Sequence, residues 1–349
     1  MPSRITVPEK ALRTLVSDIF AAAGTSREHA DTVADVLVWA NLRGVDSHGV
    51  SRIPRYLELF GNGQANARPQ ITVDQRRSAV AIVDADAAPG PVALTRAVDE
   101  AVSMARSAGV AWVSVRGTVH TGAIGYYTER AAQYGMAALG IVAGVPNMAY
   151  PGTGAAAVAT SPLSVAVPAG RHPTVLLDMA TAVIALGRIA QYKASGQPLP
   201  DGAALAADGT PTTDPALAKI PMPAAGAKGA GMSLVFELLA SGLTANPIVS
   251  GYHSGDPAGR RHRQNAVLMA IDIAAFTPVE DFRSLVDATV DAVKSLPPTD
   301  PAAPLLVPGE RGARTHDERS SNGIPLPAGL VSKLREQAEA LGVAVPEGL

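Results

Sequence analysis

The 349-residue chain contains no cysteine, which excludes disulfide bonds and thiolate metal sites and fits a reducing compartment. Its formal net charge is −2, so it has no excess of lysine and arginine to neutralise the phosphates of a nucleic acid. Aromatic residues make up only 4% of the chain, too few to suggest a platform on which bases stack. We therefore expect no nucleic-acid partner.

Charge is also absent from one long stretch, Ala131–Gly170, which raises the question of a membrane span. Prolines interrupt this stretch at positions 146, 151, 162 and 168, so it suits buried strands and turns better than a spanning helix. We interpret it as deep core or subunit interface. The N-terminus lacks an apolar run followed by a small-residue cleavage site. The predictions are a soluble, cytoplasmic protein and no membrane partner.

Helical patterns mark the N-terminal part. Residues 8–23 carry an apolar stripe, with Pro8 suited to the first turn and Gly24 to the stop. A second helix is expected from Ser26, as N-cap, to about Arg43.

The middle of the chain alternates between apolar runs typical of strands and amphipathic segments typical of helices. Strands are expected at Ala79–Val83, Val110–Val115, Leu139–Val145, Leu163–Val167, Val175–Leu177 and Ala266–Ile271. Helices are expected at Pro91–Ala108 and at about 122–134, 181–194, 229–242, 279–294 and 327–341. Loops or a linker are expected at 202–227, 249–263 and Pro297–Pro308.

These patterns predict an α/β fold in two domains, and a hydrophobic fraction of 47% can supply their cores. Residues 1–72 and 282–349 are expected to form a helical domain from both termini, and residues 73–281 an α/β domain. No Gly-x-Gly-x-x-Gly follows a strand, so an ordinary Rossmann domain is not expected.

A polar constellation lies between the second helix and the first predicted strand. If Ser47 caps a third helix, His48, Arg52 and Tyr56 stand at i, i+4 and i+8 and share one face. Histidine transfers protons near neutral pH, and arginine grips a carboxylate with two parallel hydrogen bonds. Together they indicate acid–base chemistry on a small anionic substrate.

Two alternatives remain open at this point. Pro54 falls inside the expected helix, which could instead begin at Val50 or Ser51, so the shared face would be weakened. A purely structural interpretation is a capping serine, a turn histidine and solvated arginines. Spacing alone favours the structural interpretation.

A series of motifs along the chain favours the functional interpretation of these residues over the structural one. The segment Ser47-His48-Gly49, followed by Arg52 and Tyr56, resembles the signature of the malate/L-lactate dehydrogenase family, which is unrelated to the Rossmann-fold lactate dehydrogenases. That family includes ureidoglycolate dehydrogenases, sulfolactate dehydrogenases, diketogulonate reductases and cyclic imino-acid reductases. Further segments resemble its motifs in family order: Val115–Ala123, Ala159–Pro162, Leu177–Thr181, Asp208–Pro215, Ala225–Met232, Pro308–Glu310 and Asn322–Ile324.

The resemblance implies a homodimeric oxidoreductase with a non-Rossmann, mixed-sheet nucleotide-binding domain, which moves a hydride between NAD or NADP and a small 2-oxo or 2-hydroxy acid. His48 matches the proton donor, Ser47 supports it, and Arg52 matches the carboxylate-binding arginine. His120 matches a histidine that serves acid–base catalysis in some members and cofactor binding in others. Substrate contacts are expected at Tyr56, Thr160 and Arg188.

Arg188 is singled out because the family's imino-acid reductases resemble one another in placing an aspartate there, ten residues after the position of Asp178. A cation suits an anionic oxo acid better than an imine. A helix-surface arginine is the structural alternative.

Cofactor contacts follow from the same resemblance. Glycines beside a lysine at a helix start favour an anion such as a cofactor phosphate. The alternatives are an Asp178 that only caps a helix and a Lys228 that lies in a surface turn. The expected cofactor residues are His120, Thr121, Gly122, Asp178, Met179, Ala180, Gly226, Lys228, Pro308, Gly309 and Glu310.

Two other functions stay open: reduction of a cyclic imine such as a pyrroline- or piperideine-2-carboxylate, and binding without catalysis on a former enzyme scaffold. Metal catalysis is not expected, because the remaining histidines lack ligand spacing: His29, His172, His253, His262 and His316. We expect His253 and His262 to be solvated in an arginine-rich loop.

Overall fold

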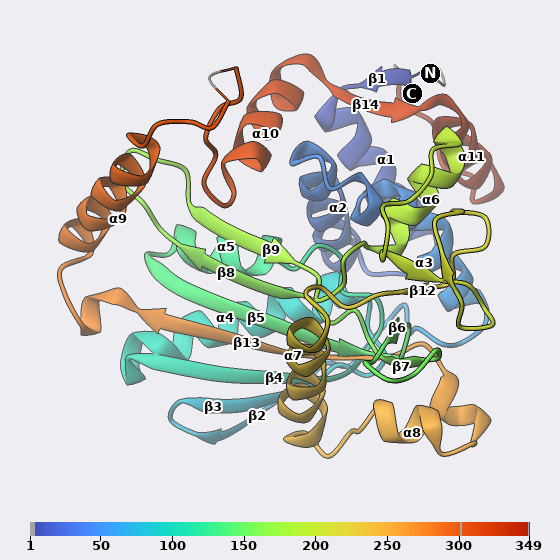
Figure 1. Cartoon of the computed structure of the whole chain (residues 1–349), viewed down its shortest axis with the longest axis horizontal. Helices are drawn as coiled ribbons and strands as arrows, with labels where there is room; N and C mark the ends of the chain where they lie inside the picture. The colour runs from blue at the N-terminus through green and yellow to red at the C-terminus, as the bar shows by residue number, and fades with distance from the viewer. Residues whose placement is uncertain (1–3, 301, 348) are drawn as a thin grey trace.

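The computed structural model describes residues 4–300, 302–347 and 349, and its centre is a sheet with the strand order β2-β3-β4-β13-β5-β8-β9 (Figure 1). Within this sheet β3 and β4 pair in parallel, and the other neighbours are antiparallel. The mixed sheet confirms the predicted α/β fold and differs from a parallel Rossmann sheet. Its strands are β2 Thr72–Arg77, β3 Val80–Asp84, β4 Val110–Thr118, β5 Met136–Gly144, β8 Leu163–Val167, β9 Val175–Met179 and β13 Gln264–Asp272.

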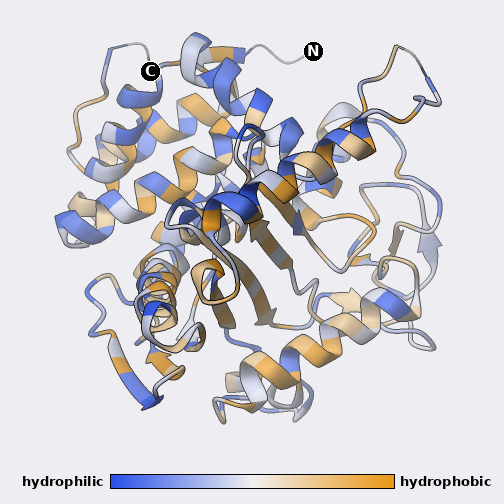
Figure 2. Cartoon of the chain, turned by 90° about the vertical axis from the view of Figure 1, so that its left-hand side faces the viewer, coloured by the Kyte–Doolittle hydropathy of each residue, from blue (hydrophilic) through white to orange (hydrophobic). Residues whose placement is uncertain are grey.

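Helices pack on both faces of the sheet. Helices α4 (Gly90–Ala108) and α5 (Gly125–Gln133) pack on one face, while α7 (Ala227–Glu237) and the π-helical turn η3 (Leu238–Gly242) pack on the other. In Figure 2 the central strands are mainly hydrophobic, and the surrounding helices show both colours. The uncharged stretch 131–170 contains β5 and β8, so its lack of charge belongs to the sheet's core.

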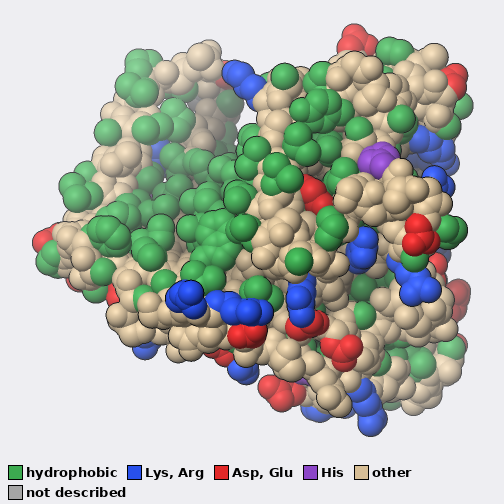
Figure 3. All heavy atoms as spheres, turned by 90° about the horizontal axis from the view of Figure 1, so that it is seen from below, with side chains coloured by type: hydrophobic (Ala, Val, Ile, Leu, Met, Phe, Trp, Pro, Cys, Tyr) green, Lys and Arg blue, Asp and Glu red, His purple; other side chains and the backbone are tan. Residues whose placement is uncertain are grey.

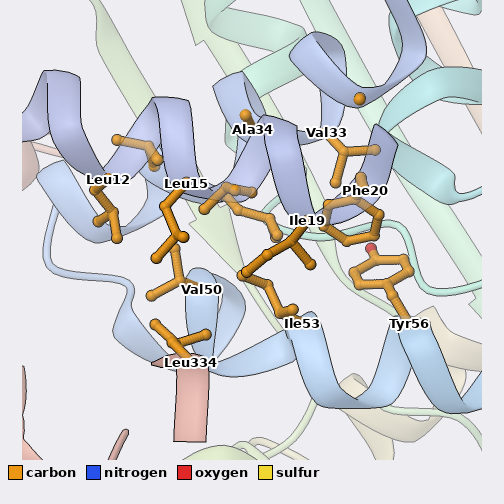
Figure 4. Close-up of a cluster of buried hydrophobic side chains, with 14 of the residues drawn as sticks. Leu12, Leu15, Ile19, Phe20, Val33, Ala34, Val50, Ile53, Tyr56 and Leu334 are labelled. Atoms are coloured by element: carbon orange, nitrogen blue, oxygen red, sulfur yellow. The ribbon is translucent and has the colours of Figure 1, made fainter. Parts of the chain in front are cut away.

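The two ends of the chain come together beside the sheet. Strand β1 (Arg4–Val7) pairs antiparallel with β14 (Ile324–Pro327). Figure 4 shows the apolar cluster below them, where Leu12, Ile19 and Val50 pack near Leu334. This arrangement agrees with a helical part built from both termini, although the exact domain boundaries stay a prediction. The helices of this part are α1 Glu9–Ala22, α2 Arg27–Leu42, α3 Ile53–Gly61, α10 Glu310–Asn322 and α11 Ala328–Ala340.

Shorter elements connect these parts. The turns of 3-10 helix are η1 Asp46–His48, η2 Val50–Arg52, η4 Pro257–Arg260 and η5 Ile273–Ala275; the remaining helices are α6 Leu186–Ser195, α8 Val249–His253 and α9 Val279–Lys294. The short strands are β6 Met148–Ala149, β7 Ala156–Val158, β10 Ala204–Leu205, β11 Pro211–Thr212 and β12 Ile220–Pro221.

Several elements were not predicted. Strand β2 is an exposed edge strand, and α10 has no apolar stripe, so neither carries the pattern that reveals a buried face. The expected loop 202–227 holds the small sheet β11-β10-β12, and the loop 249–263 holds α8 and η4. Among the helices of the described residues, we find none with the length and hydropathy needed to cross a membrane.

Candidate active site

The segment between α2 and α3 carries the central polar side chains. The prediction that Ser47 begins one helix through Tyr56 is wrong: η1 and η2 precede α3, which begins at Ile53. Pro54 occupies the first turn of α3, where its missing N–H costs no hydrogen bond. His48 and Arg52 therefore lie on consecutive tight turns rather than on one helical face.

Asn41 and Gly49 hold these turns against α2. The buried Asn41 side chain accepts a hydrogen bond from the Val50 N–H at 2.8 Å and donates to Asp46 at 2.8 Å. A Cβ atom at Gly49 would lie 2.1 Å from Asn41 Oδ1, so the close approach requires glycine. Arg319 of α10 pairs with Asp46 at 2.7 Å and ties the C-terminal part to the same loop.

Two imidazoles meet at the centre of the site. The rings of His48 and His120 are stacked, with centroids 5.6 Å apart. Ser47 Oγ lies 2.9 Å from His48 Nδ1, which leaves His48 Nε2 on the other side of the ring. The buried Tyr56 hydroxyl donates to the His120 carbonyl at 2.7 Å, and Figure 4 shows its ring beside Phe20.

Two groups contact Nδ1 of His120: the Tyr56 hydroxyl at 3.1 Å and the Gly122 N–H, and the second favours one tautomer of the ring. The Gly122 N–H donates to His120 Nδ1 at 3.2 Å. A ring nitrogen that accepts this bond carries no proton, so the neutral His120 bears its proton on Nε2. His120 is therefore set up as a hydrogen-bond donor through Nε2.

Both histidines are held neutral. Burial, followed by the charge of Arg52, lowers the pKa of His48 to about 4. Burial and then Arg52 also lower the pKa of His120 well below its ordinary value. Burial raises the pKa of Tyr56, so this hydroxyl keeps its proton.

Arg52 brings an uncompensated positive charge to this cluster. Its Nε donates to the Ser47 carbonyl at 2.5 Å, and within the described residues no carboxylate pairs with its guanidinium. A Cβ atom at Gly187 would lie 2.6 Å from Ser47 Cβ and 3.7 Å from Arg52 Nη2, so the start of α6 packs over both residues. A half-buried arginine without a counterion is suited to an anionic ligand.

A second group of predicted residues gathers where β9 ends and α7 begins. The Thr181 carbonyl accepts from the Ala224 N–H at 2.8 Å, and the Thr181 N–H donates to the Thr160 carbonyl at 3.3 Å. The Asp178 carboxylate accepts from the Gly125 N–H, at the start of α5, at 3.0 Å. The segments around residues 160, 178–181 and 224–229 therefore meet.

The comparisons with known proteins agree with this geometry. Residues 7–335 match the family model described as malate/L-lactate dehydrogenase. The chain belongs to the malate/L-lactate dehydrogenase family. It is therefore related to enzymes that oxidise hydroxy acids.

Two relatives illustrate the range of the family. The chain is 30% identical over 341 residues to a malate/(S)-sulfolactate dehydrogenase of Methanothermus fervidus, covering 97% of this chain and 98% of the relative. It is 31% identical over 307 residues to a ureidoglycolate dehydrogenase (NAD(+)) of Escherichia coli K12, covering 87% of each.

Solved structures show the same similarity. The sulfolactate dehydrogenase from Methanocaldococcus jannaschii has a TM-score of 0.87 at 31% identity, covering 97% of this chain and 98% of that one. The delta1-piperideine-2-carboxylate reductase from Pseudomonas syringae has a TM-score of 0.83 at 28% identity, covering 95% and 99%.

The residues of this dehydrogenase fit a nicotinamide dinucleotide. The Thr181 hydroxyl is buried without a hydrogen-bond partner among the described residues, beside the start of α7. A Cβ atom at Gly226 would meet nothing within 4 Å, so the backbone there is open to a ligand. Lys228 is exposed next to it and can reach a phosphate.

Asp178 stands at the edge of this region. Crowding by protein atoms raises the pKa of its carboxyl to about 6, against the opposing effects of the Gly125 N–H and Arg43, although the residue as a whole is exposed. Met179 is also exposed and Ala180 half-buried, so both can contact a cofactor.

The segment Pro308–Glu310 is anchored to β9. The Pro308 carbonyl accepts from the Leu176 N–H at 3.1 Å, and Arg43 donates to the Gly309 carbonyl at 3.1 Å. Burial raises the pKa of Glu310, but hydrogen bonds from Lys294 and Arg314 outweigh it and lower that pKa to about 2. The carboxylate of Glu310 is already engaged, so its cofactor role stays a prediction.

Arg188 lies away from the imidazole cluster, which is formed by His48 and His120. Its guanidinium is exposed on α6, donates to Gln191 at 3.2 Å and lies 5.6 Å from the centroid of the Tyr192 ring. Its substrate contact stays a prediction without a geometric basis in the single chain.

His262 was missed. The expectation that it is solvated is wrong, because its Nε2 is buried, and burial followed by Arg55 and Arg52 lowers its pKa to about 4. No periodic pattern marks a loop residue that returns to a site 200 positions earlier. His253, in contrast, is exposed as expected.

Proposed function

We propose that this dehydrogenase interconverts a small 2-oxo acid and the matching 2-hydroxy acid with NAD or NADP. The observation that carries the proposal is the stacked pair of neutral imidazoles, His48 and His120, beside an Arg52 that has no carboxylate partner in the part of the chain described. Proton donors and a carboxylate-binding cation are the protein groups that this reaction needs.

Each group has a role that follows from its contacts. Arg52 holds the substrate carboxylate through its terminal nitrogens. When the substrate carboxylate offsets the charge of Arg52, His48 can take up a second proton. The imidazolium gives this proton to the 2-oxo oxygen during reduction, and the neutral ring accepts it during oxidation, while Ser47 orients the ring. His120 donates a hydrogen bond to the substrate through Nε2. Tyr56 supports His120 from the interior, because its buried hydroxyl donates to the His120 carbonyl, and Thr160 stays a proposed substrate contact.

The cofactor supplies or accepts the hydride when it is bound. Asp178 to Thr181 and Gly226 to Lys228 are the segments that would hold it, with Lys228 directed to a phosphate. The turn of His120, Thr121 and Gly122 is the third proposed cofactor segment, and the Tyr127 hydroxyl keeps it in place by donating to the Thr121 carbonyl at 2.6 Å.

The experiment is a substrate panel, with NADH and NADPH oxidation followed at 340 nm. The panel holds pyruvate, oxaloacetate, sulfopyruvate, phosphonopyruvate, bulkier 2-oxo acids and the two cyclic imines. Turnover with an oxo acid supports the proposal and names both cofactor and substrate. Tight cofactor binding without any turnover contradicts it and leaves a binding function.

Imine reduction is the second candidate, supported by the similarity to the piperideine-2-carboxylate reductase structure. The resemblance leads us to expect an aspartate at position 188 in such reductases, and the lack of that carboxylate favours the oxo acid, although Arg188 itself is exposed on α6 and lies away from the two imidazoles. Turnover confined to the imines of the panel would reverse this order.

We further propose a homodimer, in keeping with the resemblance, and a cytoplasmic location. An apolar groove lies between β3, β4 and η3, lined by Val80, Ile82, Trp112, Leu239 and Leu243. Figure 3 shows a hollow with hydrophobic walls on the underside of the molecule. Light scattering that gives the mass of one chain at micromolar concentration would contradict the dimer.

A further inference from the structure

The loop before β13 is tied to both elements that carry the imidazole cluster. The His262 N–H donates to the Gln64 side chain, just after α3, at 3.1 Å. Two residues later, the Gln264 side chain accepts from the Thr121 N–H, next to His120, at 2.8 Å. These two bonds hold His262 at the side of the site, although its loop is far away in the sequence.

The ring of His262 has an unused polar atom. Its Nε2 is buried and has no hydrogen-bond partner among the described residues. A buried polar atom without a partner costs stability, and such atoms in folded proteins call for an explanation such as a functional role. A ligand that reaches this nitrogen would recover the lost bond.

The charges around His262 indicate which ligand that is. Arg55 and Arg52 are the charges that act on its ring, and His262 in turn acts on His120. Arg55 pairs with Glu58 at 2.7 Å, but both of those side chains are exposed, so the pair neutralises the interior weakly. When one substrate carboxylate binds Arg52, it neutralises the charge of that residue. The charge of Arg55 then still acts on His262 and leaves a positive region beside it.

We propose that His262 is a specificity-determining residue, which together with Arg55 receives a second acidic group at the far end of the substrate. This inference rests on the proposed function and narrows it to 2-oxo and 2-hydroxy acids with two anionic groups. An imidazole with its proton on Nε2, or an imidazolium formed beside the anion, donates a hydrogen bond to that group.

The test compares a dianion with a monoanion on matched variants. Calorimetry measures the binding of L-malate and L-lactate without cofactor, and steady-state kinetics compare oxaloacetate with pyruvate. The variants are His262→Phe, which keeps a ring but no nitrogen, and His262→Gln, which keeps a donor near Nε2. His253→Phe, on an exposed histidine of the neighbouring α8, is the control.

We expect His262→Phe to weaken malate binding and kcat/KM for oxaloacetate by about tenfold or more, with changes of about twofold or less for lactate and pyruvate. His262→Gln should retain part of the preference, and His253→Phe all of it. Equal losses for both acids, or no loss, would overturn the inference.

Two results separate this inference from the proposed function. A wild-type protein that binds and turns over both acids equally well contradicts only the role of His262. A wild-type protein that binds neither acid and reduces none contradicts the proposed function as well. If His262→Phe does not fold, His262→Gln decides, because an unchanged dianion preference and an equal loss for both acids each overturn the proposal.

Discussion

Among the residues that the structure describes, the Arg52 side chain makes one hydrogen bond, from its Nε to the Ser47 carbonyl, and this leaves its terminal nitrogens available for a carboxylate. Arg52→Lys replaces a planar fork by a point charge, so KM for the acid should rise about tenfold while kcat changes less. Steady-state kinetics check this. Arg188→Lys, on the exposed side of α6, is the matched control. An equal rise in both variants would bring Arg188 into the substrate site.

His48 is the residue on which proton transfer depends in this account. His48→Ala should lower kcat by about 10²–10⁴-fold, the usual contribution of a general acid, and leave cofactor affinity nearly unchanged. Stopped-flow rates and a fluorescence titration with NADH and NADPH measure the two quantities. Unimpaired turnover would remove His48 from the mechanism. The exposed His253→Ala should match the wild type.

Residues inside short local motifs could be predicted from the sequence. Ser47, His48 and Arg52 stand close together in the chain, and the structure keeps them together near His120. His262 could not be predicted, because only the folded loop and its bond to Gln64 bring it to the cluster.

Helix α6 packs over Ser47 and Arg52 at Gly187, near its first residue. Gly187→Ala would place a Cβ atom 2.6 Å from Ser47 Cβ, so α6 or the Ser47 turn must move. We expect a loss of about 1–3 kcal/mol in the free energy of unfolding and a lower kcat/KM.

Urea unfolding and kinetics measure both effects, with Gly329→Ala in α11 as the control. A Cβ atom at Gly329 meets nothing within 4 Å, so that change should be neutral or stabilise by up to about 1 kcal/mol. A Gly187→Ala protein as stable and active as the control would show that α6 does not press on Ser47.

Elements with a buried face were predicted well, and elements without one were not. Strands β5 and β13 and helix α4 carry apolar patterns, and they lie close to the expected positions. The polar β2 and α10 lack such patterns, and their positions depend on pairing with β3 and packing on α2. Pro54 determines where α3 starts, because proline is favoured in the first turn of a helix and not in its interior.

The whole molecule should lose stability in mild acid because three half-buried histidines of one site stay neutral in the folded state. The folded pKa is about 4 for His48 and His262 and well below 6.5 for His120, while the unfolded chain titrates near 6.5. Below pH 6.5 the unfolded state binds protons that the folded state does not, so stability present above pH 6.5 is lost as the pH falls toward 4.

Each such histidine contributes a slope of about 1.4 kcal/mol per pH unit in this window. Urea unfolding at pH 7, 6 and 5 measures the total, and His262→Phe should make the slope visibly smaller. A free energy of unfolding that stays constant across the window would contradict the burial of these rings as neutral groups.

The central claim is hydride transfer to the C2 atom of an oxo acid, and isotope tracing tests it most directly. The protein is incubated with NADH or NADPH that carries two deuterium atoms at C4 and with a mixture of 2-oxo acids, and the products are examined by mass spectrometry and NMR. The account predicts one deuterium at C2 of a 2-hydroxy acid. Deuterium found only in a cyclic amino acid after imines are supplied, or in no product at all, would contradict it.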